Sequence, residues 1–370
     1  MALKGSKKIA ILVAGLPPVY NGGTEIATVN IARYAAEAGH EVHIIAADGT
    51  RQGVRLYGAQ ERGYKVHRVQ TIPIAYFYGL YYLPGAVRQV LKLKPDLVHA
   101  QGMYMGLVAY VANLVSGIPY LVYSRGEMYV KWPFKRQISR LVMRWANRVI
   151  AQTEDMRHGL QAILSRDVEV IPNGVDLQDF VPMSKSEART KLGLQPNSKF
   201  VLFVGRARPE KNLFGFVETM DYLRGRGDCC AIVVGDGPQL SRAKCLANSL
   251  DLSNITFKGN VDNKDVPLYM YASDVLVNTS FSEGFPTTFL EAMASGLPIV
   301  APSICGVPEI VENGANGILV EPKNPELMAL AVNRILNDSD LAKAMSRNNL
   351  KKAKQYSWEN VVEKLYDKET

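Results

Sequence analysis

KIAILVAGLPPVYNGGTEIATVNIARYAAEAGHEVHIIA, residues 8–46, decides the fold of the first half of this chain. An apolar run (Lys8 to Ala14) is followed by a glycine- and proline-rich loop, a helical pattern (Thr24 to Ala38), a capping Gly39 and a second apolar run (Glu41 to Ala46). Strand, helix and strand in this order form a βαβ unit, in which the two strands lie parallel.

The same alternation continues along the chain. Further strand patterns of the first half lie at Lys65 to Val69, Leu97 to Ala100, Tyr120 to Tyr123, Arg148 to Gln152 and Val168 to Ile171. After a turn-rich break at Pro172 to Asp176 the rhythm restarts, with strand patterns at Phe200 to Val204, Cys230 to Val234, Ile255 to Lys258, Val275 to Asn278, Ile299 to Ala301 and Gly317 to Val320. Each half therefore predicts a doubly wound parallel sheet.

We predict an α/β fold of two Rossmann-like domains that face each other across a cleft. The expected domains are residues 1–175 and 176–354, and residues 355–370 are expected to form a C-terminal helix that packs back on the first domain. Ligands of such sheets bind at the carboxyl ends of the strands, so the site is expected in the cleft.

Composition indicates a soluble globular protein. The chain has 370 residues, of which 47% are hydrophobic and 21% charged, enough for two cores. Four cysteines without a CxxC pair favour a reducing, cytosolic compartment. The apolar run Ile9 to Ala14 is too short for a signal peptide, and the uncharged Met103 to Ser124 is interrupted by Asn113, Gly117 and Pro119, which favours a buried helix and strand over a membrane span.

The net charge of +8 lies in the first half. Residues 1–180 hold 21 lysines and arginines against 13 acidic residues, whereas the second half is balanced. This distribution favours an anionic partner for the first domain, the alternative being a solvated basic face.

The richest segment for chemistry is Asp274 to Pro298, DVLVNTSFSEGFPTTFLEAMASGLP. A strand, a tight loop with Glu283 and Gly284, and Pro286 in the first helical turn bring a helix N-terminus to the predicted cleft, where its N–H groups favour an anion. Glu291, one turn into the helix, has the chemistry to accept hydrogen bonds from a ribose diol, and Glu283 from sugar hydroxyls. Taken singly, each feature is more simply read as dipole compensation or a turn.

Two further groups of residues fit a phosphate ligand. Arg206 and Lys211, in the loop after a strand, place two cations where they would neutralise a diphosphate. Gly22 and Gly23, after the first strand, allow backbone N–H groups to approach a phosphate. A basic loop is usually solvated surface, and a Gly-Gly pair alone is weak evidence for a phosphate site.

The order of these motifs resembles the retaining GT-B glycosyltransferases of family 4 over nearly the whole chain. The matching motifs are Gly22-Gly23-x-Glu25, Ile171-Pro-Asn173-Gly174-Val-Asp176, Gly205-Arg206 with Glu210-Lys211-Asn212, Gly235-Asp236-Gly237-Pro238, and Glu283-x7-Glu291. The resemblance implies a hexosyltransferase with an N-terminal acceptor-binding domain and a C-terminal nucleotide-sugar-binding domain.

The resemblance also implies roles for single residues. Arg206 and Lys211 would hold the donor diphosphate, Glu291 the ribose, and Glu283 the transferred sugar. The remaining donor-binding residues would be Gly22, Gly23, Gly205, Gly235, Gly237, Lys258, Val261, Gly284, Phe285, Pro286 and Thr287.

Two positions depart from the family pattern. Many relatives carry a second histidine where this chain has Gln101, which leaves His99 as the histidine nominated for catalysis, although a lone histidine at a strand end is more often structural. The second departure is Ser124-Arg125-Gly126-Glu127, where relatives often have a histidine and where Arg125 and Glu127 are candidates for the acceptor side.

The resemblance implies that no metal and no cofactor are needed. The sequence agrees, since it has no Asp-x-Asp motif at the expected strand end and no His/carboxylate cluster with ligand spacing. The nucleotide sugar would be the donor substrate and not a cofactor. We expect a front-face displacement in which the acceptor hydroxyl attacks from the side of the departing diphosphate.

The acceptor is expected on the first domain. Ile72 to Pro84 is aromatic and uncharged, and Lys131 to Arg148 is a basic amphipathic pattern, typical of a helix on anionic lipid and equally of a helix covering the sheet. We therefore expect the acceptor to be lipid-linked or a glycan precursor. We expect the protein to be cytoplasmic and peripheral on the membrane. Alternatives are a sugar-nucleotide epimerase or phosphorylase, and a nucleic-acid-binding protein, for which no motif is found.

Overall fold

The computed structural model describes residues 5–17, 22–48, 63–70, 78–125 and 133–367. The chain divides into two compact units. Unit 1 contains Met1–Gly174 and Trp358–Thr370, and unit 2 contains Val175–Ser357. The chain therefore leaves unit 1 once and returns to it for its last helix.

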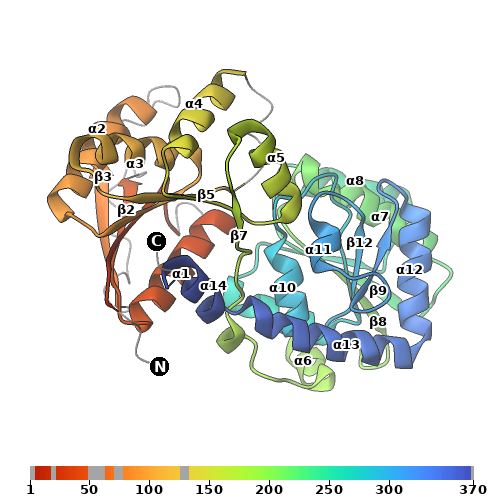
Figure 1. The fold of residues 1–370 in the computed structure, drawn as a ribbon. Helices are drawn as coiled ribbons and strands as arrows, with labels where there is room; N and C mark the ends of the chain where they lie inside the picture. Colours follow the sequence, from red (N-terminus) through yellow and green to blue (C-terminus); the bar gives the residue numbers. More distant parts are fainter. Residues whose placement is uncertain (1–4, 18–21, 49–62, 71–77, 126–132, 368–370) are drawn as a thin grey trace. The chain divides into compact units, whose positions relative to one another are not determined.

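Unit 1 is built on a parallel sheet (Figure 1). Among the described residues it has seven strands in the order β3-β2-β1-β4-β5-β6-β7. The strands are β1 (Lys8–Val13), β2 (Glu41–Asp48), β3 (Lys65–Gln70), β4 (Leu97–Gln101), β5 (Tyr120–Tyr123), β6 (Arg148–Ala151) and β7 (Glu169–Val170). Every predicted strand of this half is present, because alternating helices return the chain to the same edge of the sheet each time.

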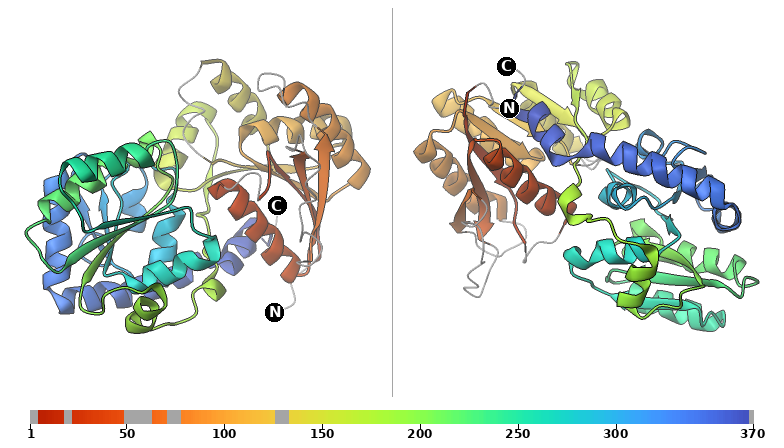
Figure 2. Two further views of the ribbon diagram at one scale, coloured as in Figure 1. Left: turned by 180° about the vertical axis from the view of Figure 1, so that it is seen from behind. Right: turned by 90° about the horizontal axis from the view of Figure 1, so that it is seen from below.

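Helices cover both faces of this sheet. The helices on one face are α2 (Tyr78–Leu93), α3 (Met103–Ser116), α4 (Pro133–Arg144) and α5 (Glu154–Leu164). The other face packs against α1 (Gly23–Glu37) and α14 (Trp358–Tyr366), which lie side by side (Figures 1 and 2). Trp358, Leu365 and Tyr366 of α14 are buried in that core. A Cβ atom on Gly174 would come within 2.6 Å of Cε3 of Trp358, so the glycine makes room for the returning helix.

Unit 2 repeats the architecture with a six-stranded parallel sheet, in the order β10-β9-β8-β11-β12-β13. Its strands are β8 (Lys199–Val204), β9 (Cys229–Val234), β10 (Ile255–Gly259), β11 (Val275–Val277), β12 (Ile299–Pro302) and β13 (Gly317–Val320). Its helices are α6 (Lys185–Leu192), α7 (Leu213–Tyr222), α8 (Leu240–Ser249), α9 (Val266–Ala272), α10 (Thr287–Ala294), α11 (Val307–Ile310), α12 (Pro325–Asn337) and α13 (Ser339–Ala353). Short 3-10 helices complete it: η2 (Leu177–Asp179), η3 (Pro209–Lys211), η4 (Asn263–Asp265) and η5 (Lys354–Tyr356).

The strand order identifies one position in each sheet where the direction of winding reverses. In unit 2 the chain moves from β8 outward to β9 and β10, then returns to β11 on the other side of β8 and continues to β12 and β13. In unit 1 the corresponding reversal lies between β1 and β4. Loops that leave neighbouring strands in opposite directions part at these positions and form the usual ligand crevice of an open α/β sheet.

The uncharged segment Met103 to Ser124 forms α3 and the buried strand β5, as its interruptions predict. Among the described residues, no helix has the length and apolar character needed to cross a membrane.

Candidate functional site

Two loops meet at the reversal point of the unit 2 sheet, one after β8 and one after β11. The backbone N–H of Phe281 donates to the carbonyl oxygen of Glu210 at 2.8 Å, and the Thr279 hydroxyl donates to the carbonyl oxygen of Asn212 at 2.8 Å. These bonds join segments about 70 residues apart in the sequence and fix their geometry before any ligand is present.

The joined loops bring Lys211 and Glu283 together. Lys211 Nζ lies 2.8 Å from Oε1 and 2.7 Å from Oε2 of Glu283. Oε1 also accepts from Asn278 Nδ2 at 2.9 Å and from the Ser280 hydroxyl at 2.6 Å. Glu283 is 6% exposed, and its carboxylate is therefore a buried anion whose charge and lone pairs are met by neighbours. Lys211 is the one cation among these neighbours, and it remains partly exposed.

The loop then continues into α10, which begins at Thr287. Pro286 is its N-cap and no side chain caps the helix, so the N-terminal N–H groups receive no hydrogen bond from a capping side chain. A proline at this position removes one donor that would otherwise need a partner. Gly284, Phe285 and Thr287 are partly exposed beside this helix end, where the N-terminal dipole favours an anionic group.

Glu291 lies in the second turn of α10, with part of its surface accessible. Burial of the carboxyl group away from water raises its pKa from 4.5 to about 7, and the negative charge of Asp179 adds to this shift. Among the described residues no hydrogen bond satisfies its side chain. A carboxyl group in this state gains from a ligand that brings hydroxyl donors, because such donors stabilise the ionised form.

Arg206 lies exposed directly after Gly205, at the end of β8. The two glycines that follow β9 have a packing reason: Gly235 has φ +127° and Gly237 φ +151°, and a Cβ at Gly237 would come within 2.8 Å of the carbonyl oxygen of Ala207. At Gly235 the added atom would collide with the carbonyl oxygen of Gly205. These glycines therefore allow the loop after β9 to lie against the loop that carries Arg206.

Lys258 and Val261 lie at the end of β10, on the same edge of the sheet. Lys258 is exposed, and Val261 packs partly against the core beneath α10. The sheet order places β10 two strands away from β8, at the side of the edge rather than at the reversal point.

In unit 1, Gly22 and Gly23 form the start of α1, and no side chain caps this helix either. A Cβ atom on Gly23 would meet no atom of the described residues within 4 Å. Packing among the described residues therefore gives no reason for glycine at this position, whereas close approach of a ligand would.

His99 lies in the core of unit 1. It is fully buried, and its Nδ1 shares a hydrogen bond with the hydroxyl of Tyr366 from α14 at 2.7 Å. Burial, followed by the charges of Arg125 and Arg148, holds the pKa of His99 well below its usual value, so the ring is neutral. This placement favours the structural alternative over the catalytic role predicted for His99.

Arg125 is tied to its own unit rather than extended toward a ligand. Its Nε donates to Gln101 Oε1 at 2.6 Å, its Nη1 donates to Asn173 Oδ1, and its guanidinium lies 3.9 Å from the centre of the Tyr123 ring. The acceptor role predicted for Arg125 therefore requires these bonds to rearrange or a ligand that meets the remaining edge of the guanidinium. Glu127 lies outside the described residues.

The sequence prediction missed the residues that hold Glu283. Asn278 and Ser280 form a polar Asn-Thr-Ser run directly after the apolar β11, which is a signal for side chains at a sheet edge. Asp179, which contributes to the raised pKa of Glu291, carries no comparable signal.

Comparison with known proteins identifies the relatives of the chain. The family model described as Glycosyltransferase Family 4 matches residues 21–179, and the one described as Glycosyl transferases group 1 matches residues 184–352. The UDP-Gal:alpha-D-GlcNAc-diphosphoundecaprenol alpha-1,3-galactosyltransferase of Escherichia coli is 30% identical over 275 residues, 70% of each chain. The D-inositol 3-phosphate glycosyltransferase of Mycobacterium marinum is 28% identical over 404 residues, 97% of this chain and 84% of the relative.

Solved structures share the fold. Sucrose-phosphate synthase from Thermosynechococcus elongatus has a TM-score of 0.85 at 21% identity, with 97% of each chain covered. Anabaena HepE in complex with UDP-glucose has a TM-score of 0.81 at 21% identity, covering 97% of this chain and 98% of that one.

Proposed function

The chain belongs to the family 4 glycosyltransferases with the GT-B fold, and we propose that it moves a hexose, with retention of configuration and without a metal ion, from a nucleotide-diphosphate sugar to an acceptor hydroxyl. The observation that carries this proposal is the Lys211–Glu283 pair beside the uncapped start of α10, at the reversal point of unit 2. It combines a partly exposed cation and a helix N-terminus, both suited to phosphate, with a carboxylate suited to hydroxyls.

In the proposed complex, Arg206, Lys211 and the N–H groups of α10 bind the diphosphate. Glu291 accepts hydrogen bonds from the ribose diol, and the hydroxyls of the transferred hexose bind beside Glu283. The diphosphate gains negative charge as its bond to the anomeric carbon breaks, and cations fixed in advance stabilise that charge most in the transition state.

The state of Glu283 bears on the route by which retention would be achieved. Its oxygens already accept hydrogen bonds from Lys211, Asn278 and Ser280, which makes the carboxylate a poor nucleophile. The proposed reaction therefore forms no covalent enzyme intermediate. The acceptor oxygen bonds to the anomeric carbon on the face that the diphosphate leaves, the carbon–oxygen bond to the diphosphate breaks, and a diphosphate oxygen takes the acceptor proton.

The proposed acceptor is a lipid-linked glycan intermediate, because α4 of unit 1 combines a packed side and a basic exposed side. Val142 and Met143 are buried in the core, which shows that α4 covers the sheet. Its exposed residues include Arg136, Arg140 and Arg144, together with Leu141 at 45% and the following Trp145 at 62% exposure. Arginines with an interleaved leucine and tryptophan have the chemistry that binds anionic headgroups and the adjoining acyl region. The named substrate of the Escherichia coli relative is also carried on a lipid diphosphate.

The donor is tested first, by measuring the unfolding temperature in the presence of UDP, GDP and ADP hexoses. A ligand at about 100 times its dissociation constant stabilises the folded protein by roughly 2.7 kcal/mol. The donor found in this way, labelled in the hexose, is then incubated with lipid-linked acceptors in the presence and absence of EDTA. Transfer with retained configuration and unchanged rate in EDTA supports the proposal, whereas conversion of the donor without an acceptor would identify an epimerase.

A further inference from the structure

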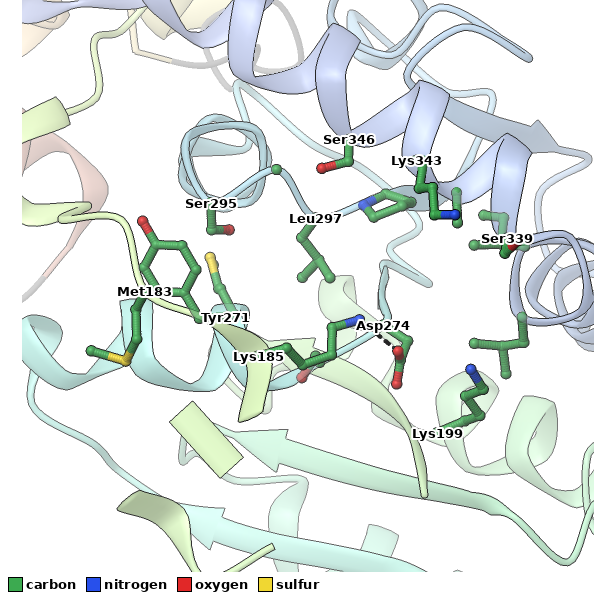
Figure 3. Close-up of a pocket in the computed structure, with 17 residues that line it drawn as sticks. Met183, Lys185, Lys199, Tyr271, Asp274, Ser295, Leu297, Ser339, Lys343 and Ser346 are labelled. Atoms are coloured by element: carbon green, nitrogen blue, oxygen red, sulfur yellow. Dashed lines mark hydrogen bonds and ion pairs between the residues drawn. The ribbon is translucent and has the colours of Figure 1, made fainter. Parts of the chain in front are cut away.

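A cavity of about 360 Å³ lies in unit 2 at the edge of the sheet where the strands begin (Figure 3). Lys199 is the first residue of β8, Asp274 directly precedes β11, and Pro298 directly precedes β12. The candidate donor residues follow the opposite ends of these strands. The length of a strand, roughly 15 Å, therefore separates this cavity from the site proposed for the nucleotide sugar.

The charged residues that line the cavity are mostly cations. Lys185 comes from α6, Lys199 from β8 and Lys343 from α13, and the single acidic lining residue is Asp274. The three lysines and Asp274 lie around the same space in Figure 3. Lys343 Nζ also lies 3.7 Å from Oδ1 of Asp340, which is strongly exposed. Water screens such an exposed ion pair, so it neutralises little of the charge of Lys343.

Asp274 does not offset the positive charge of Lys199 and Lys343, because its carboxylate is already paired with other groups. Its Oδ1 lies 2.6 Å from Lys185 Nζ, and its Oδ2 accepts from Arg189 at 2.8 Å and from the backbone N–H of Phe200 at 2.7 Å. Two cations therefore surround one carboxylate, and Lys199 and Lys343 add to the excess. The cavity is positive, and its acidic residue is not available to repel an anion.

The rest of the lining combines apolar side chains with hydroxyl groups, of which Tyr271, Ser273 and Ser295 carry three. Met270, Leu297 and Leu336 are buried side chains that form part of the wall, and Ser339 and Ser346 add hydroxyl groups. The volume falls near the lower end of the range for pockets that bind small molecules, about 300–1,000 Å³. An occupant that satisfies both parts of this surface has an apolar body and an acidic group.

We propose that this cavity binds a small amphipathic anion, a molecule with an apolar body and one acidic group, at a site separate from that of the nucleotide sugar. Lys199 and Lys343 hold the acidic group, and the apolar body lies against Leu297 and Leu336. The occupant also contacts the turn from Ser295 to Pro298 that ends α10. That helix carries Glu291, so the ligand touches one end of the element that is proposed to hold the donor at the other.

The probe for this site is 8-anilinonaphthalene-1-sulfonate, which pairs an aromatic body with one sulfonate. Titration calorimetry on the full chain is expected to show saturable binding of one molecule per chain. N-phenyl-1-naphthylamine, which lacks the sulfonate, and sodium sulfate, which lacks the apolar body, are each expected to bind at least tenfold more weakly. UDP is expected not to displace the probe.

Charge reversal locates the binding. Lys199→Glu and Lys343→Glu are each expected to weaken binding of the sulfonate probe at least tenfold. Lys351→Glu, an exposed lysine of the same α13 that does not line the cavity, is the matched control and is expected to leave binding unchanged. The unfolding temperature shows whether a charge reversal disturbs folding. If it does, Lys199→Gln and Lys343→Gln, which change the charge less, replace the glutamate variants, and they too are expected to bind the sulfonate probe more weakly than the Lys351 variant.

The proposal is overturned by any of three results: folded Lys199 and Lys343 variants that bind the sulfonate probe as well as the Lys351 variant, equal affinity for the sulfonate and the uncharged probe, or full displacement by UDP. None of these outcomes depends on which sugar the enzyme transfers.

Discussion

Lys211 Nζ lies within 2.8 Å of both carboxylate oxygens of Glu283, a residue 72 positions further along the chain. The pair gives Lys211 a structural task in addition to the diphosphate contact proposed for it. Removal of the lysine leaves a buried carboxylate with hydrogen bonds but without a counter-ion.

Lys211→Ala is therefore expected to lower both turnover and stability. The loss of stability should be about 2 kcal/mol, below the value for a fully buried pair because the lysine is 28% exposed. A double-mutant cycle with Glu283→Gln, measured by urea unfolding, should give a coupling energy of about 1–3 kcal/mol. Additive effects of the two substitutions would show that the ion pair contributes nothing to stability.

Arg206→Ala separates binding chemistry from folding. Arg206 is exposed, so its removal should change the free energy of unfolding by less than about 0.5 kcal/mol. Loss of a cation that stabilises the leaving diphosphate should lower kcat by about 100-fold or more. Arg208→Ala, an exposed arginine two residues on, is the matched control and should retain most activity. Full turnover of the Arg206 variant would remove this residue from the mechanism.

Glu291 predicts a pH dependence of stability. Its pKa rises from 4.5 to about 7 on folding, so the folded protein binds this proton more tightly than the unfolded chain. The resulting stabilisation is complete below pH 4.5 and is lost as the pH rises through 7. Glu291→Gln keeps the group neutral, and the variant should match the wild type at about pH 4 and exceed it at pH 8 by up to about 3 kcal/mol.

Urea unfolding at the two pH values measures this difference, and Glu218→Gln, at an exposed position of α7, is the control. An equal gain in stability at both pH values would show that the carboxyl of Glu291 does not change its ionisation on folding.

Two glycines of the proposed donor site are expected to respond in opposite ways to alanine. Gly235→Ala should cost about 2 kcal/mol or more, because the residue has φ +127° and the added methyl would collide with the carbonyl oxygen of Gly205. Gly23→Ala should leave stability unchanged or slightly higher, since no atom of the residues that the structure describes lies within 4 Å of the added atom. The Gly23 variant should nevertheless bind the identified donor at least tenfold more weakly, measured by calorimetry. Unchanged donor affinity would exclude close ligand approach at Gly23.

Binding to anionic membranes is expected to depend on α4. Replacement of Arg136, Arg140 and Arg144 by glutamate should reduce flotation with phosphatidylglycerol vesicles at least tenfold, because each cation near such a surface contributes about 1 kcal/mol. The same replacement of Arg347, Lys351 and Lys354, exposed in unit 2, is the control. Wild-type protein that fails to float at low salt, or that floats equally with phosphatidylcholine alone, would remove the membrane from the proposal.

The sequence predicted most of the fold because its signals are local. Apolar runs, the glycine and proline positions and the helical periods between them locate the strands of both sheets, and parallel order follows from the alternation. The same local patterns placed Glu283, Gly284 and Pro286 on one loop before α10. Their roles in binding stay predictions.

Features that depend on distant contacts were not predictable in this way. The bond between Lys211 and Glu283 requires two loops to be joined through Phe281 and Thr279, and no local pattern encodes that. The same holds for His99, whose burial under Tyr366 is decided by a helix 267 residues further along the chain. The backbone packing of Gly235 and Gly237 was likewise not predicted, and the donor contact predicted for both stays a prediction.

The return of α14 to unit 1 has a consequence for how the protein is made. The core under β1, β4 and β5 includes Trp358, Leu365 and Tyr366, which a ribosome adds only after all of unit 2 has been synthesised. Unit 2 is contiguous, so its sequence is complete before that of unit 1. The second face of the unit 1 sheet has only α1 as cover until α14 is synthesised. A premature stop near residue 357 would therefore expose apolar surface at the opposite end of the sequence from the lesion.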